Sequence, residues 1–259
     1  TGTGPLFSYT PTLDYNGLDQ FGYTVSDGTT TTAESTVVIE IDPVDDAPIL
    51  DAIAAVTVFE DSGEATVTIT GIGAGGDTDE DVQTIALVAT SLNSAYIPTP
   101  TITGTTATRT LTFTPAADAT GDVTILVTAT DTGLDGDSGG PSGATHFNTG
   151  GQQFTVTLTP LNDAPSFDAV TDVTMDEDAT PSPISITTVS AGGGADELTQ
   201  TVTVTATSSD TAIVPDPTVS GTGDTRVLTF TPVAETSGTV TVTVTATDDG
   251  ADDGATEFS

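Results

Sequence analysis

The chain has 259 residues, with 38 Asp and Glu against 2 Lys and Arg, and a formal net charge of -36. This charge repels phosphate backbones and anionic lipid headgroups, so it excludes nucleic acids and membrane surfaces as partners. The absence of Cys excludes disulfides and thiolate metal sites, and a single His with no Lys leaves few catalytic groups, so we expect no enzyme. No apolar run is long enough to span a bilayer, so we also expect no direct membrane insertion.

Threonine-rich segments with a period of two run along the chain, which contains 59 Thr. The clearest, in chain order, are residues 36–41 (TVVIEI), 155–159 (TVTLT), 199–206 (TQTVTVTA) and 239–246 (TVTVTVTA). Strict alternation of Thr with apolar residues is typical of strands with one buried and one wet face. Gly, Pro, Asp and Asn turn signals separate such segments, and no stretch has a helical period. The sequence therefore predicts an all-β fold of tandem antiparallel β-sandwiches with about seven strands each.

Two interpretations of the threonines stay open. Thr suits an exposed pleated surface and protects strand edges without any further function. The alternative is a dedicated Thr array, such as an ice-binding face or a densely O-glycosylated surface.

An internal repeat divides the chain. The motif Asp-Ala-Pro at residues 46–48 recurs at 163–165, and the same offset of 117 aligns the residues that follow it, including LTFTP at 111–115 and 228–232. Residues 1–45 match the second half of the repeat at an offset of 104. We therefore predict the C-terminal half of a module at 1–45, a complete repeat at 46–162, and a second copy at 163–259 that lacks its last strand.

Acidic residues gather where the predicted modules meet. Two carboxylates about 5 Å apart repel each other by roughly 3 kcal/mol at an effective dielectric constant near 20, so several of them at one pole need a counter-charge. Oxygen ligands without nitrogen or sulfur favour Ca2+ over zinc or copper, and a flexible ligand number favours Ca2+ over Mg2+. The alternatives are solvated acidic loops and adaptation to high salt, neither of which needs calcium.

Several motifs resemble a known family. YTVSDG at 23–28, the strand at 36–41, DPVDDAP at 42–48 and LNDAP at 161–165 are similar to the end of a cadherin domain and its linker. They resemble more closely the bacterial cadherin-like and Ig-like tandem repeats of large adhesin-type surface proteins. The resemblance covers essentially the whole chain, and it implies Greek-key β-sandwiches with Ca2+ bound between consecutive modules.

The resemblance also implies a set of metal ligands at each junction. At the first junction the implied ligands are Asp42, Asp45, Asp46, Asp77, Asp79 and Asp131. At the second junction they are Glu60, Asn162, Asp163, Asp196 and Asp248. Pro160 and Leu161 stand where cadherin linkers carry ligands, and Gly194 replaces the first Asp of the Asp-x-Asp motif. We therefore expect the second junction to bind fewer ions, or to bind them more weakly.

Together these features predict a calcium-stiffened extracellular rod that serves in spacing, adhesion or matrix building. The expected partners are Ca2+, neighbouring modules of the same chain, and other copies of the chain or cell-surface and matrix components. The alternative is a self-assembling filament, sheath or surface-layer subunit joined by strand complementation, since the third predicted module lacks a strand. An enzyme or glycan-binding module is a third possibility, which rests only on paired carboxylates.

Three residues outside the acidic clusters stand out. Arg109 and Arg226 occupy equivalent positions before the LTFTP strands, and we predict a structural ion pair for each. His146 lies in a Gly-rich loop at 133–151, and we expect it to be a surface residue without a catalytic role.

Overall fold

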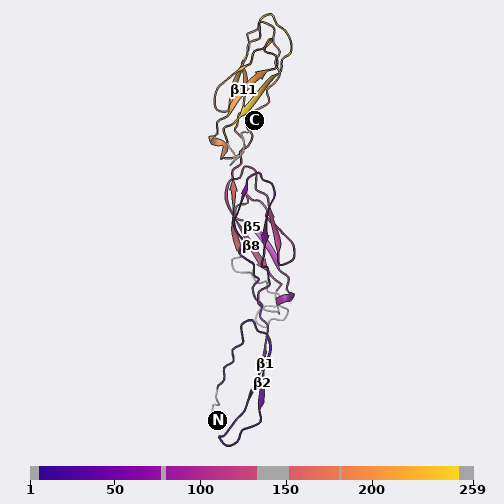
Figure 1. The fold of residues 1–259 in the computed structure, drawn as a ribbon, viewed down its shortest axis with the longest axis vertical. Coiled ribbons are helices and arrows are strands. Elements are labelled where there is room, and N and C mark those ends of the chain that lie inside the picture. The colour runs from indigo at the N-terminus through magenta and orange to yellow at the C-terminus, as the bar shows by residue number, and fades with distance from the viewer. Residues whose placement is uncertain (1–5, 77–79, 133–151, 181–182, 251–259) are drawn as a thin grey trace. The chain divides into compact units, whose positions relative to one another are not determined.

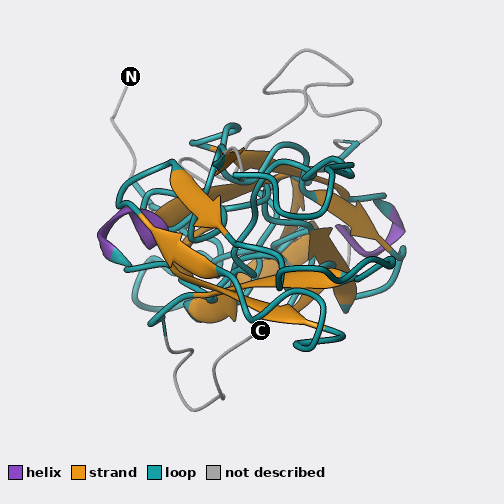
Figure 2. Ribbon diagram, turned by 90° about the horizontal axis from the view of Figure 1, so that it is seen from above, coloured by secondary structure: helices purple, strands orange, loops and turns teal. Residues whose placement is uncertain are grey.

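The computed structural model describes residues 6–76, 80–132, 152–180 and 183–250. Figure 2 shows that strands and loops dominate, and two single-turn 3-10 helices, η1 (Glu80–Val82) and η2 (Glu197–Thr199), accompany them. The strands are β1 (Gly17–Tyr23), β2 (Ser35–Ile41), β3 (Val56–Phe59), β4 (Ala65–Ile69), β5 (Ala86–Ser91), β6 (Thr101–Thr103), β7 (Arg109–Phe113), β8 (Gly121–Thr130), β9 (Gln152–Thr159), β10 (Ile184–Ile186), β11 (Thr203–Ser208), β12 (Thr218–Ser220), β13 (Arg226–Thr229) and β14 (Val242–Thr247). The predicted all-β fold of antiparallel β-sandwiches is confirmed. Asp77, Asp79 and His146 lie outside the described residues.

The chain divides into two compact units. One contains residues 1–56, 64–114 and 123–156, and the other contains residues 57–63, 115–122 and 157–259. The predicted module boundaries at residues 46 and 163 follow the sequence repeat and stay a prediction. Each unit contains one of the two acidic junctions, so each junction can be described by itself.

The described residues of the first full copy form seven strands in two sheets, with the orders β3-β9-β8-β5 and β4-β7-β6. Figure 1 labels β5 and β8, which pair in the larger sheet. The described pairs are antiparallel, as in β5 with β8 (Ala86 opposite Thr130) and β4 with β7 (Ala65 opposite Phe113). Strand β8 buries alternate residues from Val123 to Ala129 and leaves its threonines partly exposed. This is the alternation that the sequence predicts, because apolar residues pack on one face of each sheet.

The second copy builds its sheets from β10-β13-β12 and β11-β14. Its core joins residues of both sheets, and the fully or largely buried members are Ile186, Val189, Val204, Ala206, Leu228 and Ala246. On the other face of β11 and β14 the threonines stand opposite one another, as Thr205 does opposite Thr245. The exposed Thr side chains of β11 thus alternate with its buried Val and Ala.

The 117-residue offset also relates the elements of the two copies. It maps η1 onto η2, β5 onto β11 and β6 onto β12, residue for residue. It also relates turns with left-handed backbone, since Asp61 (φ 54°) corresponds to Asp178 (φ 60°), and Asp118 (φ 56°) corresponds to Glu235 (φ 56°). Asp tolerates this conformation better than most residues because its short side chain can bond locally. The tandem repeat is therefore a repeat of structure as well as of sequence.

The segment before the first full copy forms a β-hairpin. Strands β1 and β2 pair in antiparallel register from Gly17 opposite Ile41 to Tyr23 opposite Ser35. Asp27 caps the loop between them by accepting hydrogen bonds from the backbone N–H groups of Thr29 (2.9 Å) and Thr30 (2.8 Å). Within the described part of the chain, no helix is long and apolar enough to cross a membrane.

Candidate metal centre at the second junction

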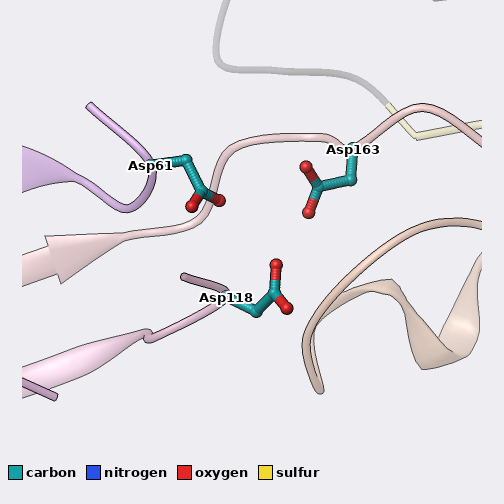
Figure 3. Close-up of side chains that lie close together, drawn as sticks. All are labelled: Asp61, Asp118 and Asp163. Atoms are coloured by element: carbon teal, nitrogen blue, oxygen red, sulfur yellow. The ribbon is translucent and has the colours of Figure 1, made fainter. Parts of the chain in front are cut away.

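Three aspartates converge at one end of the first full copy. Asp61 follows β3, Asp118 lies between β7 and β8, and Asp163 follows β9. Their carboxylates point toward one another in Figure 3, and one oxygen from each lies within 4.8 Å of the other two. Asp61 and Asp118 both have the left-handed backbone described above. Three like charges at such spacing repel one another by several kcal/mol unless a cation or protons neutralise them.

A glycine leaves the space in which these carboxylates meet. A Cβ atom on Gly193 would lie 2.0 Å from Oδ1 of Asp118 and 2.6 Å from Oδ2 of Asp163. Its neighbour Gly194 has a left-handed backbone (φ 54°), and a Cβ atom there would lie 2.3 Å from Oδ1 of Asp196. A side chain at either position would therefore have to displace a carboxylate.

Further carboxylates at this junction are buried. Glu60, Glu197 and Asp248 are 1%, 4% and 6% exposed, respectively. One oxygen of Glu60 accepts a hydrogen bond from the backbone N–H of Leu161 (2.9 Å). The other oxygen, together with Oε2 of Glu197 and Oδ2 of Asp248, is sealed from solvent and has no hydrogen-bond partner among the described residues. A buried carboxylate without a partner is costly, so these oxygens point to a ligand.

The pKa values of three of these carboxyl groups are raised. Burial raises the pKa of Glu60 to about 7, and repulsion from Asp196 and Asp61 adds to the effect. Burial also raises the pKa of Asp163, helped by repulsion from Asp61 and Asp118. The pKa of Glu197 is raised in the same way, by burial and then by its acidic neighbours. The acids thus form one electrostatically connected group.

A hydrogen-bonded frame holds the linker against the second copy. Gln200 donates from its side-chain amide to Oδ1 of Asn162 (2.8 Å), and Nδ2 of Asn162 donates to Oδ1 of Asp248 (3.3 Å). The backbone N–H of Asp163 donates to Oε1 of Glu197 (3.4 Å). Residues of η2 and of the loop after it therefore position the linker without any metal.

The first junction repeats this frame. Asp45 is buried and accepts a hydrogen bond from the amide of Gln83 (2.9 Å), while the backbone N–H of Asp46 donates to Oε1 of Glu80 (3.2 Å). Asp131 is buried as well, at 3% exposed, whereas Asp42 is exposed. The frame residues of the two junctions are related by the 117-residue offset.

The structure thus brings the residues implied for the second junction into one region. Glu60, Asp163 and Asp196 belong to the electrostatic group, and Asn162 bonds Asp248. Sequence reasoning did not nominate Asp61, Asp118 or Glu197 as ligands. The repetition of the Glu-Asp pair at 177–178 and of an acid at 235 was a usable signal, since both recur at the repeat offset.

A comparison with protein families finds a match for the first part of the chain. Residues 1–40 match the bacterial Ig domain family. The resemblance to bacterial Ig-like repeats is confirmed for this segment. No curated protein matches the chain.

Among solved structures, domains 4 and 5 of the S-layer protein SbsC are similar at 18% identity, with a TM-score of 0.30, covering 54% of this chain and 57% of that one. Domains 4–9 of SbsC are similar at 18% identity, with a TM-score of 0.29, and the match covers 90% of this chain and 34% of that one. Extracellular cadherin domains 1–5 of protocadherin gamma B2 are similar at 15% identity, with a TM-score of 0.46, and the match covers 92% of this chain and 43% of that one. The chain therefore spans about half or less of these proteins.

Proposed function

We propose that the chain is a structural, non-enzymatic repeat region of an extracellular surface protein, in which Ca2+ stiffens the junctions between modules. The observation that carries this proposal is the set of buried carboxylate oxygens without partners at the second junction, on Glu60, Glu197 and Asp248. Neighbouring modules of the same chain are the first partners of each module. Other copies of the chain, or surface and matrix components, are candidates for contacts between molecules.

The chemistry of the donors supports Ca2+ as the ion. Every candidate ligand at the second junction offers oxygen, and Ca2+ takes six to eight oxygen ligands from carboxylates, amides and water. Asp61, Asp118 and Asp163 would hold one ion, because their oxygens already converge. Glu60 and Asp196 lie next to this group, as their mutual repulsion indicates.

The ion would join two parts of the chain that otherwise repel each other. Asp61 and Asp118 belong to turns at the end of the first full copy, whereas Asp163 is tied by its backbone to Glu197 of η2 in the second copy. A bound Ca2+ supplies positive charge that replaces repulsion with shared coordination. The linker then bends less at this junction.

The first junction would work in the same way. Asp42, Asp45, Asp46 and Asp131 are its described candidates, and Asp77 and Asp79 complete the set implied by the resemblance. The equivalent hydrogen bonds of Gln83 and Glu80 support this assignment. We expect it to bind more ions, or to bind them more tightly, than the second junction.

Small-angle X-ray scattering with Ca2+ and with a chelator tests the proposal. We expect Ca2+ to increase the maximum dimension of the molecule, because the linker bends less. The far-UV circular dichroism spectrum should stay the same, because the strands do not change. An unchanged maximum dimension, with Ca2+ bound, would contradict stiffening.

A second candidate function is assembly by strand addition. Strand β8 pairs with both β5 and β9, whereas its equivalent β14 pairs only with β11 among the described residues. The backbone groups along such an edge can pair with a strand of another molecule. Sedimentation at increasing protein concentration tests this candidate, which predicts ordered polymers; a monomer at all concentrations would contradict it.

A further inference from the structure

The two basic residues of the chain are buried, and neither forms an ion pair with a described residue. Arg109 and Arg226 start β7 and β13, at equivalent positions of the two copies, and each is 8% exposed. The ion pairs predicted from the sequence do not form within the described residues. Each guanidinium instead donates to backbone carbonyl groups, which hold it in place but carry no net negative charge.

The bonds of Arg226 leave part of its guanidinium available. Nη1 donates to the carbonyl oxygens of Gly223 (2.5 Å) and Thr225 (3.3 Å), and Nη2 donates to that of Val202 (2.8 Å). A guanidinium has five N–H donors, so two remain. One of them is on Nε, whereas the bonds to described residues come from Nη1 and Nη2.

Both arginines line cavities at equivalent places. The cavity beside Arg226 has a volume of about 550 Å³, and the one beside Arg109 has a volume of about 280 Å³. Gln200, Thr201 and Thr222 supply polar groups to the larger cavity, and Leu198 and Val219 supply apolar surface. Their equivalents Gln83, Thr84 and Thr105 line the smaller one. The larger volume falls in the usual range of small-molecule sites.

The charges in the larger cavity select among anions. One guanidinium can neutralise one negative charge, and the buried carboxylate of Glu197 also lines the cavity. A phosphate would bring a second negative charge against Glu197. A carboxylate with hydroxyl groups fits better, because its hydroxyls can form hydrogen bonds with the side chains of Gln200, Thr201 and Thr222 without adding charge.

We propose that this cavity binds a sugar acid of the uronic acid class, with its carboxylate on Arg226, its hydroxyls on Gln200, Thr201 and Thr222, and a ring face on Leu198 and Val219. The planar fork of arginine suits a carboxylate, and the mixed polar and apolar lining suits a sugar ring. The cavity borders the second junction, because Glu197 lines it, but the contacts proposed for the sugar acid need no metal.

Calorimetric titration with galacturonate, in chelator and again with Ca2+, tests the proposal. We expect saturable binding, and a loss of about tenfold or more in affinity for galactose or for the methyl ester of galacturonate, which lack the charge. The variant Arg226→Met should lose a similar factor, whereas Arg109→Met, at the smaller cavity, should not.

The ligand series keeps the test decisive even if Arg226→Met does not fold. Equal affinities for galacturonate and its methyl ester would overturn the proposal. The absence of galacturonate binding to the unmodified chain, or binding that Arg226→Met leaves unchanged, would overturn it as well. Because these titrations are run without Ca2+ too, their failure is separate from a failure of the calcium proposal.

Discussion

Gln200 donates a hydrogen bond of 2.8 Å from its side-chain amide to Oδ1 of Asn162, and Gln83 makes the equivalent bond to Asp45 in the preceding repeat. Each linker is therefore fastened to the module that follows it by bonds that need no metal. The contribution left for a cation is to hold Asp61 and Asp118 of the preceding copy against Asp163.

The first prediction concerns this fastening. Gln200→Met keeps the length of the side chain but removes the amide that donates to Oδ1 of Asn162. We expect a loss of about 1 kcal/mol in the free energy of unfolding, measured by urea denaturation with and without Ca2+. Gln20→Met, on the exposed surface of β1, is the control and should change stability little. Equal stabilities for Gln200→Met and the unmodified chain would show that the frame is not stabilising.

The second prediction concerns the converging aspartates. Asp163→Asn removes one charge from the group that includes Asp61 and Asp118. In chelator we expect a gain of about 1 kcal/mol in stability, because repulsion is relieved. Affinity for Ca2+ should fall by about tenfold or more, because ligand charge sets affinity.

Thermal melting and calorimetry measure these two effects of Asp163→Asn. Asp172→Asn, at an exposed position, is the matched control. A loss of stability in chelator, or unchanged Ca2+ affinity, would contradict the assignment of Asp163 to the metal centre.

The third prediction concerns pH. The pKa of Glu60 is about 7 in the folded chain and near 4.5 when unfolded, so the folded state binds the extra proton between these values. Stability in chelator should therefore fall as the pH rises from about 5 to about 7, and then level off. Glu60→Gln should flatten this part of the profile. Ca2+ binds the ionised form, so its stabilising effect should grow over the same range; a flat profile in chelator would argue against a buried Glu60.

The fourth prediction concerns the glycine beside the metal centre. Gly193→Ala would place Cβ against the carboxylates of Asp118 and Asp163, so we expect Ca2+ affinity to fall by about tenfold. Gly73→Ala is a matched control, because its Cβ would meet only Ile49 at 3.4 Å. Terbium luminescence titration compares the two variants, and equal affinities would show that the carboxylates do not need this space.

The fifth prediction concerns the core. Leu111→Ala removes a fully buried side chain from β7, and we expect a loss of 2–5 kcal/mol, roughly, in the free energy of unfolding. Leu92→Ala, at a side chain that is 63% exposed, should cost much less. Similar losses for both variants in urea denaturation would mean that β7 does not lie in a packed core.

The sequence predicted the fold well because its signals are local and repeated. Alternation in β8 and β11 follows from the period of a strand, and the offset of 117 then relates η1 to η2 without reference to any structure. The predicted ion pairs do not form in the part of the chain that the structure describes, for a reason that the sequence does not show. Arg109 and Arg226 donate to the backbone carbonyl groups of Ile85 and Val202, just before β5 and β11, and carbonyl positions depend on the fold rather than on residue type.

The candidate site was predicted in part. Residues such as Glu60 and Asp163 followed from the family resemblance, but Asp61 and Asp118 did not. Both residues lie in turns with left-handed backbone, and such a turn at Asp is not marked by a glycine in the sequence.

The most direct test of the central claim is a calorimetric titration of the chain with Ca2+, at low salt and again in molar NaCl, alongside Asp163→Asn. We predict saturable binding that persists in molar salt, because the buried oxygens of Glu60, Glu197 and Asp248 are screened little by dissolved ions. We also predict that Asp163→Asn weakens it. Binding that is absent, or that molar salt abolishes in the unmodified chain, would contradict a calcium-bound junction and favour acidic loops adapted to salt.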